Sequence, residues 1–386
     1  MGVITAPVAG SVCTPACTAW VKIDGVVINS VSLLLMACPK WSLINGCVKG
    51  CANATLRIFG AAVLVVALER AGLLGVLKLD LLDTASLSGY QAFPVDEWLN
   101  GCVSSPLDWG LTEHQVTEGI RLIETEGLFP NGPDVREIHR IYWPFAMMLA
   151  ERVREYLDER AGDPNACYVL GLSGSVSVGK TTAARVLRTL LSWCVGRVEV
   201  VATDHFLLPN ETLQARGIMR RKGFPESYDD DAIRAFVTAL RRGDETLVTP
   251  VYDHVAYTRL PDREKVIPRP KCLILEGVSA LQRPEWQLDG RLYFQADPDS
   301  LWRWYLARFM EFRRRASDRP NAFFYRYAQM TEDEAQSVAR DFWHNINWVN
   351  MMDHIEPSRE GADWILEKGA DHRVQRILIR SDDSVC

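Results

Sequence analysis

The segment from Val169 to Arg185 carries the residues whose types and spacing point most directly to chemistry. An apolar run is followed by a turn rich in Gly and Ser, and the turn fits the phosphate-loop pattern of Gly, four residues, Gly, Lys and Ser or Thr. The glycines allow successive backbone N–H groups to point at an anion, and the helix that follows adds its positive end. We therefore expect a nucleotide phosphate site made of Gly174, Ser175, Val176, Ser177, Val178, Gly179, Lys180, Thr181 and Thr182.

Two side chains are expected to serve the Mg²⁺ that accompanies a nucleotide. The Thr181 hydroxyl can hold the ion, while Lys180 places a compact cation on the β- and γ-phosphates. Residues 272–276 form an apolar run that predicts a buried strand ending in an acid, Glu276. This pattern is similar to the second nucleotide motif of phosphate-loop enzymes, in which the acid orients Mg²⁺ through water.

A further acid is expected at the same edge of the sheet. Residues 198–203 predict a strand, and Asp204 follows at its carboxyl end. Because ligands bind at the carboxyl edge of open parallel sheets, Asp204 should lie beside the phosphate loop. There it can accept a proton from a substrate hydroxyl or help to hold Mg²⁺. The structural alternative is that Asp204 only caps the next turn.

Two segments downstream could contact a substrate. Residues 250–257 place Tyr252, His254 and Tyr257 between two expected strands, with hydrogen-bonding tips on apolar side chains. A lone His is more often structural, but this trio favours a substrate role. The basic segment 216–228 could meet phosphates or could simply be solvated.

A long helix expected over 300–315 carries several arginines. Such a charge run is usually a solvated face, but an arginine near the γ-phosphate stabilises the charge of phosphoryl transfer. We single out Arg308 because its neighbours make one side of the helix apolar, as a lid requires; these are Tyr305, Phe309 and Phe312. Residues 321–327, which include Tyr327, add an aromatic cluster, and a helix is expected over 332–352.

The remaining pattern predicts an α/β phosphate-loop NTPase fold with a mostly parallel central sheet flanked by helices and a helical lid. Further helices are expected over 112–126, from Asp134 onward with an end or kink at Pro144, and over 180–193 and 232–242. Further strands are expected over 292–296, 363–368 and 374–380.

Composition narrows the class of protein. The formal net charge is −6, hydrophobic residues make up 48% and charged residues 24% of the 386 residues, which is ordinary for a globular protein and indicates no nucleic-acid partner. The cysteines from Cys102 onward are scattered and read as reduced core residues of a cytoplasmic protein. We expect residues 89–386 to form the catalytic domain.

Residues 1–88 are expected to be an apolar, Cys-rich extension of unknown role. Their apolar runs are shorter than a membrane span needs, so no membrane association is expected. We expect residues 58–82 to be the most helical part. The two cysteine pairs are Cys13 with Cys17 and Cys47 with Cys51; a zinc site is the alternative to a weakly ordered extension.

Taken together, the segments from Tyr90 to Arg380 resemble the bacterial type I pantothenate kinases, a branch of the phosphate-loop kinases near uridine kinase and phosphoribulokinase. The resemblance lies in the order and spacing of GSVSVGKTTAAR, a strand ending in TD, KGFPESYD, PVYDHVAY, LILEG, WYLARF, INWVN and PSRE. It implies ATP- and Mg²⁺-dependent phosphorylation of pantothenate, the first committed step towards coenzyme A. It also implies a homodimer and feedback inhibition by coenzyme A.

The resemblance assigns roles to individual residues. Asp204 would be the base on the primary hydroxyl, and Arg308 would bridge the phosphates in the transition state. The pantothenate pocket would be lined by Tyr252, His254, Tyr257, Tyr305, Asn347 and Tyr327. Lys368 and His372 match positions near the adenine. The residues that would let coenzyme A compete with ATP are Arg185, His254 and Phe312.

The chain departs from the family pattern at two positions. His205 stands where the family usually has Gly, and Ser317 stands where it often has a pocket Phe. Both put substrate tightness and feedback in question. Two alternative functions remain at this point: a related kinase for a nucleoside or sugar phosphate, which the basic residues 216–222 would suit, and a non-catalytic nucleotide-binding regulator.

Overall fold

The computed structural model describes residues 20–23, 26–29, 89–95, 98 and 133–381. The chain separates into two units, Met1–Asp83 and Thr84–Cys386. In the first unit, strands β1 (Trp20–Ile23) and β2 (Val26–Asn29) pair antiparallel. The cysteine pairs, the helix expected over 58–82 and the helix expected over 112–126 all lie outside the described residues.

The described part of the second unit is built on a seven-stranded sheet with the order β3-β11-β10-β9-β4-β8-β5. Five strands from β10 to β5 run parallel, while β11 is antiparallel to both β10 and β3. The mostly parallel α/β fold is therefore confirmed. The strands are β3 (Tyr90–Pro94), β4 (Tyr168–Gly174), β5 (Val198–Ala202), β8 (Cys272–Glu276), β9 (Gly290–Ala296), β10 (Trp364–Lys368) and β11 (Val374–Arg380).

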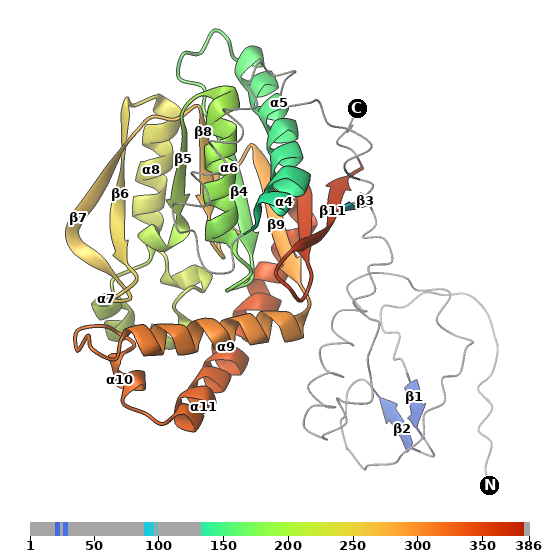
Figure 1. The fold of residues 1–386 in the computed structure, drawn as a ribbon. Coiled ribbons are helices and arrows are strands. Elements are labelled where there is room, and N and C mark those ends of the chain that lie inside the picture. The colour runs from blue at the N-terminus through green and yellow to red at the C-terminus, as the bar shows by residue number, and fades with distance from the viewer. Residues whose placement is uncertain (1–19, 24–25, 30–88, 96–97, 99–132, 382–386) are drawn as a thin grey trace, which may run out of the picture. The chain divides into compact units, whose positions relative to one another are not determined.

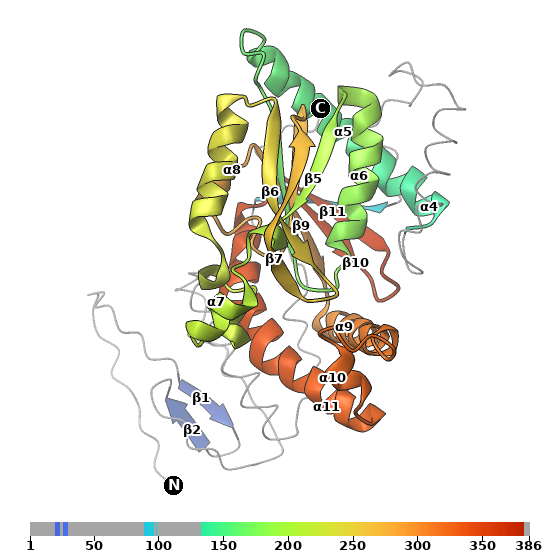
Figure 2. The ribbon, with the colours of Figure 1, turned by 90° about the vertical axis from the view of Figure 1, so that its left-hand side faces the viewer.

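The central strands form where the sequence has uninterrupted apolar runs. Every residue of β4 and of β8 is buried, because both faces of the sheet are covered. Figure 2 shows α5 (Trp143–Glu159) and α6 (Lys180–Val195) on one face and α8 (Asp230–Arg242) on the other. The helix bounds of α6 and α8 agree closely with the predicted helices.

Each covering helix follows local signals in the sequence. In α8, the Asp229 side chain accepts a hydrogen bond from the Ala232 N–H at 3.1 Å, and Gly243 ends the helix at φ 93°. Before α5, the chain forms α4 (Val135–Glu137) and the π-helical turn η3 (Ile138–Tyr142). We expected Pro144 to end or kink the helix. The helix continues through Pro144, and the irregularity is the π turn directly ahead of it. A proline has no N–H to donate to the preceding turn, which favours such an irregularity there.

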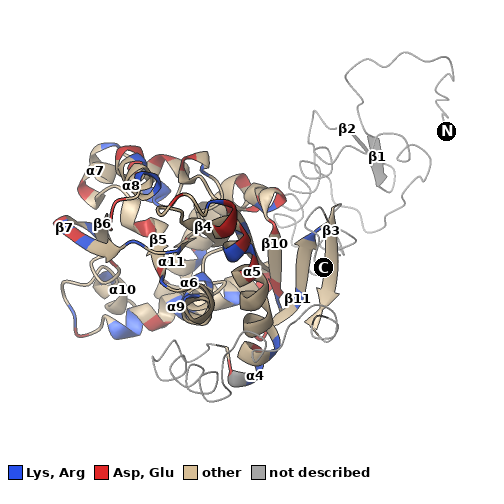
Figure 3. Ribbon diagram, turned by 90° about the horizontal axis from the view of Figure 1, so that it is seen from above, with Lys and Arg blue, Asp and Glu red and all other residues tan. Residues whose placement is uncertain are grey.

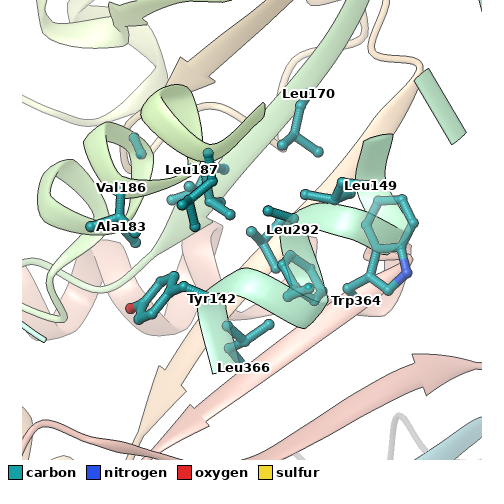
Figure 4. Packing of buried hydrophobic residues seen from close by; sticks show 14 of the residues in the cluster. Tyr142, Leu149, Leu170, Ala183, Val186, Leu187, Leu292, Trp364 and Leu366 are labelled. Carbon is teal, nitrogen blue, oxygen red and sulfur yellow. The ribbon is translucent and has the colours of Figure 1, made fainter. Parts of the chain in front are cut away.

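The main core lies between α5, α6 and the sheet. Figure 4 shows labelled side chains from these elements meeting in one layer, including Tyr142, Leu187 and Leu292. All three are at most 1% exposed. On the opposite face, α8 packs Ile233 and Phe236 against the sheet. This packing holds the carboxyl ends of the parallel strands at one edge.

A separate two-stranded hairpin consists of β6 (Thr246–Asp253) and β7 (Thr258–Pro268). As expected, residues 250–257 lie between two strands of the main sheet in chain order, β5 and β8; the unexpected feature is that they end β6 and form the hairpin tip. Most of β7 is exposed and charged, so it lacks the apolar alternation that identifies a half-buried strand.

The carboxyl-terminal helices lie beyond the lower edge of the sheet in Figure 1, where α9 (Pro298–Arg315) crosses with α10 (Tyr325–Ala328) and α11 (Glu332–Phe342) below it. The predicted helix over 332–352 is present but includes π turns. The following elements are η8 (Trp343–Asn347), α12 (Trp348–Asn350), η9 (Met351–Ile355) and η10 (Glu356–Gly361). The short connecting elements are η4 (Thr203–Phe206), α7 (Asn210–Ala215), η5 (Met219–Arg221), η6 (Pro225–Ser227) and η7 (Pro284–Trp286).

The surface carries both signs of charge. Figure 3 shows Lys and Arg mixed with Asp and Glu over the helices, in keeping with the modest net charge of −6. Among the described residues, no helix is both long enough and apolar enough to cross a membrane.

The core packing leads to a stability prediction. Replacing Leu187, which is fully buried against the sheet, by Ala should lower the free energy of unfolding by about 2–5 kcal/mol because it leaves a cavity. The control Glu151→Ala, at an exposed position on α5, should change it by less than about 0.5 kcal/mol. Urea unfolding of both variants measures the difference, and equal midpoints would contradict the described core.

Candidate active site

The phosphate loop joins β4 to α6 and depends on two glycines with positive φ. Gly174 has φ 141°, and a Cβ on it would lie 2.3 Å from the carbonyl oxygen of Phe294 on β9. Gly179 has φ 96° at the start of α6. A side chain at either position would strain the loop. The first turn of α6 leaves N–H groups without intrahelical partners, and these face the loop as an anion site.

The Lys180 side chain closes the loop from inside. Its ammonium donates to the carbonyl oxygens of Gly174 at 3.0 Å and Ser175 at 2.8 Å. Burial lowers the pKa of Lys180 to about 8; the charge of Arg308 acts in the same direction, and Glu276 and Asp204 oppose it. The residues predicted for catalysis and for Mg²⁺ binding are therefore close enough to influence one another electrostatically.

Glu276 lies between the phosphate loop and Asp204. It ends β8, in register with Leu172 on β4 and Ala202 on β5. Its Oε1 accepts a hydrogen bond from the Thr181 hydroxyl at 2.9 Å. Burial raises the pKa of Glu276, and the nearby Lys180 charge opposes this shift.

This pair fits the requirements of Mg²⁺. The described residues contain no group of three or more His, Cys, Asp and Glu side chains suited to a metal. Mg²⁺ does not need one, because it binds through one or two protein oxygens together with substrate phosphates and water. Thr181 and Glu276 supply oxygens of the required kind directly beside the loop. The buried Ser177 hydroxyl, which has no hydrogen-bond partner in the described part of the chain, is a further polar group for phosphate oxygens.

Asp204 lies in η4, two residues beyond the end of β5, and is partly exposed. Its charge acts on groups from several elements. It opposes the fall in the pKa of Lys180 and contributes to the raised pKa of Tyr257, which burial brings to about 12. Asp204 is therefore close enough to interact electrostatically with both the phosphate loop and the hairpin tip, of which only the first was expected from the sequence.

The hairpin tip presents the three predicted substrate side chains. The ring of Tyr252 lies 5.0 Å from that of His254 and 6.2 Å from that of Tyr257. Tyr257 stacks on Phe323 with centroids 4.6 Å apart. Tyr252 is buried and His254 is exposed, so the tip offers apolar faces and polar ends to one space.

The lid helices supply the other predicted residues. Tyr305 on α9 packs on Phe309, and Phe309 on Tyr327 of α10, with centroid distances of 6.4 and 5.4 Å. Burial raises the pKa of Tyr305; the Tyr257 hydroxyl adds to this rise, and a hydrogen bond with Asn347 opposes it. Arg308 is exposed on the same helix. These residues thus meet the hairpin tip from the opposite side.

Arg308 and Phe312 are neighbours on α9. The Arg308 guanidinium lies 5.1 Å from the centroid of the Phe312 ring, and that ring lies 5.2 Å from Phe324. Arg185 is exposed on α6, four residues after Thr181. Of the residues expected to bind coenzyme A, Phe312 contacts Phe324 and His254 contacts Tyr252. Arg185 instead lies on α6, the helix that follows the phosphate loop.

The two residues matched to the adenine region lie on the far side of the phosphate loop from Asp204 in the sheet order. The Lys368 ammonium is only 2.9 Å from where a Cβ of Gly179 would be, so it borders the loop itself. Burial lowers the pKa of Lys368 to about 8, and the charge of Glu137 opposes the shift. The His372 ring stacks on Trp304 of α9 with centroids 3.5 Å apart.

Glu137 was not identified from the sequence. It is 8% exposed, and its Oε1 accepts a hydrogen bond from the Val374 N–H at 3.0 Å. It is the acidic neighbour of the buried Lys368. In sequence it is one acid in an expected helix, and only the fold brings it beside the β10–β11 turn.

Lys222 is a second residue whose place in the site was missed. Its ammonium donates to Asn210 Oδ1 at 2.7 Å and to the Tyr257 carbonyl, and it lies 4.3 Å from the centroid of the Tyr257 ring. Burial lowers its pKa to about 8, and the charge of Asp204 opposes the shift. The signal was the KGFPESYD segment, which belongs to the family resemblance but gave Lys222 no role beyond that of a basic loop residue.

The two departures from the family pattern have different surroundings. His205 Nδ1 lies 2.7 Å from the Pro250 carbonyl oxygen, so this ring joins η4 to the hairpin. Ser317 is exposed in the turn after α9, where its N–H donates to the Arg314 carbonyl at 3.3 Å. Only His205 is therefore close to the reacting groups.

The buried lysines generate a pH prediction. With a pKa of about 8, Lys180 is charged below that pH and loses its proton as the pH rises through it. Phosphates favour the charged form, so ATP affinity should fall between about pH 7 and pH 9, and binding at about pH 8.5 should take up protons. Calorimetry in two buffers of different ionisation enthalpy measures this uptake. Lys180→Met should reduce it, and equal uptake at about pH 6.5 and pH 8.5 would contradict the assignment.

Part of the chain matches a known kinase family. The Phosphoribulokinase / Uridine kinase family matches residues 169–321. A D-glycerate 3-kinase from Cryptococcus neoformans var. grubii has a TM-score of 0.41 and 13% identity, covering 60% of this chain and 97% of that chain.

Curated relatives are much more similar. A protein of Rhizobium rhizogenes strain K84 named pantothenate kinase is 36% identical over 325 residues, which cover 78% of this chain and 96% of the relative. A protein of the same name from Streptomyces avermitilis is 40% identical over 271 residues, covering 64% of this chain and 82% of the relative. The phosphate loop, the fold and these relatives together lead to one conclusion: the chain is a kinase and belongs to the pantothenate kinase family.

Proposed function

We propose that this protein transfers the γ-phosphoryl group of ATP to the primary hydroxyl of pantothenate, which gives 4′-phosphopantothenate at the start of coenzyme A biosynthesis. The observation that carries the proposal is the position of Asp204, whose charge acts on Lys180 in the phosphate loop and on Tyr257 at the hairpin tip. A carboxylate between a phosphate site and a pocket for an alcohol is suited to this reaction. Relatives named pantothenate kinase support the acceptor.

In this mechanism Asp204 accepts the hydroxyl proton while the hydroxyl oxygen attacks the γ-phosphorus in line with the leaving oxygen. Lys180 contacts the β- and γ-phosphates, and Arg308 approaches them from α9 as charge spreads over the transferring group. Thr181, with Glu276 beside it, would hold Mg²⁺, and the ion would supply positive charge to offset that of the phosphates. The loop residues from Gly174 to Thr182 provide backbone N–H groups for the same phosphates.

Lys222 adds a cation on the acceptor side of the site. Its ammonium lies against the Tyr252 and Tyr257 rings at 5.0 and 4.3 Å from their centroids and interacts with Asp204. The remaining acceptor contacts in the proposal come from His254, Tyr305, Tyr327 and Asn347.

The finer assignments belong to the same proposal. Lys368 and His372 would contact the nucleoside end of ATP. Arg185, His254 and Phe312 would let coenzyme A compete with ATP as a feedback inhibitor. We also propose that residues 89–386 form the kinase domain, that the protein acts as a homodimer, and that it works in the cytoplasm, where ATP is supplied.

The alternative of a phosphorylated acceptor receives little support from the basic loop. Arg220 pairs with Asp341 at 2.9 Å, Arg221 pairs with Glu226, and Lys222 is bonded to Asn210. These three cations therefore already have partners in the described structure. A non-catalytic regulator is also disfavoured, because the loop lysine, the acid and the lid arginine all occur around one site.

The acceptor is tested by measuring ADP release from Mg-ATP with pantothenate and with a panel of nucleosides and sugar phosphates. Turnover with pantothenate alone is expected, because the hairpin tip offers aromatic faces and polar ends, while Arg220, Arg221 and Lys222 of the basic loop are already paired. A chain that begins at Gly89 should be equally active. Turnover of another alcohol with none of pantothenate would overturn the substrate assignment.

Two substitutions separate the roles of the catalytic charges. Asp204→Asn should lower kcat by about 10²- to 10⁴-fold with little change in ATP affinity, since it removes only the proton acceptor. Lys180→Met should abolish turnover and weaken ATP binding as well, because the cation contacts the phosphates. Steady-state kinetics and calorimetric ATP binding measure both effects. Near-parental rates in either variant would count against its role.

A further inference from the structure

A hydrogen bond outside the reacting groups joins the Asp204 segment to the β6–β7 hairpin. His205 follows Asp204 directly in η4, and its Nδ1 lies 2.7 Å from the carbonyl oxygen of Pro250 on β6. A carbonyl oxygen can only accept, so Nδ1 must carry the proton. In the neutral ring this leaves Nε2 unprotonated, which is a defined tautomer.

The ring makes this bond without adding a charge beside Asp204. Burial lowers the pKa of His205, and Lys265 and His254 act in the same direction, while the Pro250 bond and Asp204 oppose the shift. The ring is therefore neutral near pH 7. Its contribution to the site is geometric, since Lys222 already supplies a positive charge that interacts with Asp204 on the acceptor side.

Pro250 is a point where the hairpin needs an external contact. The register of β6 with β7 shifts between Pro250 and Tyr252, and a proline cannot donate to the strand ladder. Beyond this irregularity the ladder resumes with only two pairs, Tyr252 with Arg259 and Asp253 with Thr258, so the contact from η4 at Pro250 adds a fixed point just before the tip. Tyr252 follows two residues later and His254 four residues later, so both depend on how the strand leaves Pro250.

We propose that His205 is a positioning residue that sets the spacing between the Asp204 carboxylate and the acceptor-binding side chains of the hairpin tip through its bond to Pro250. The inference rests on the proposed function in one respect, namely that the acceptor alcohol binds at this tip. A small displacement between a base and its alcohol costs much of the rate, whereas the phosphate loop does not depend on this bond.

The test compares two variants of similar size in the full chain. His205→Leu removes the donor and should lower kcat/KM for pantothenate roughly 10- to 100-fold, with ATP affinity unchanged. His205→Asn can place its amide N–H near the position of Nδ1 and should restore most of the loss. Equal impairment of both variants, parental activity in the Leu variant, or a parallel loss of ATP affinity would each overturn the proposal.

A second measurement judges the bond without turnover. Nitrogen NMR of the imidazole should show the Nδ1–H tautomer in the parent, and hydrogen exchange of residues 251–257 should be faster in His205→Leu but not in His205→Asn. If the parent does not phosphorylate pantothenate, the proposed function fails while these readouts still decide the role of His205. An Nε2–H tautomer, or unchanged exchange in the Leu variant, would overturn that role.

Discussion

The burial of the Lys180 ammonium is the constraint on which the rest of the site depends. Removing such a charge from water is expensive unless other groups compensate it. Two loop carbonyls within 3.0 Å accept its hydrogen bonds, and Glu276 and Asp204 supply opposite charge. The lowered pKa of about 8 indicates that this compensation is incomplete without phosphates. An arriving triphosphate brings the negative charge that the buried cation still lacks.

This constraint explains why so much of the fold serves one edge of the sheet. The loop can curl around the ammonium because position 174 is a glycine. The chain passes so close to the Phe294 backbone at this point that a side chain would collide with it. The two acids reach the ammonium because β4, β8 and β5 are adjacent and parallel. The core between α5, α6 and the sheet therefore has a functional consequence, since it fixes where the three strands end.

The acceptor side is organised differently, by aromatic contacts between elements that are not part of the sheet. Tyr257 at the hairpin tip contacts Phe323 and Phe324 in the segment before α10, and Phe324 in turn contacts Phe309 of α9. A pocket made in this way can change its substrate while the phosphate chemistry stays the same.

Much of the fold could be predicted because its signals are local. The phosphate loop, the apolar runs of β4 and β8 and the amphipathic pattern of α8 are each contained in one short stretch of sequence. The β6–β7 hairpin was missed because its second strand is charged and exposed and has no apolar period. The edge strand β3 was missed for a related reason, since it is largely exposed and pairs with a strand near the other end of the chain.

For the site, the sequence alone determined which chemistry is available: a phosphate loop, an acid after each of two strands, and an arginine on a lid helix. It could not determine the partners of Lys222, Glu137 and His205, because each acts on a residue from a distant segment. The residue types determine which chemical groups are present. The distances between these groups and their charge states depend on the tertiary structure, because packing buries them next to one another and away from water.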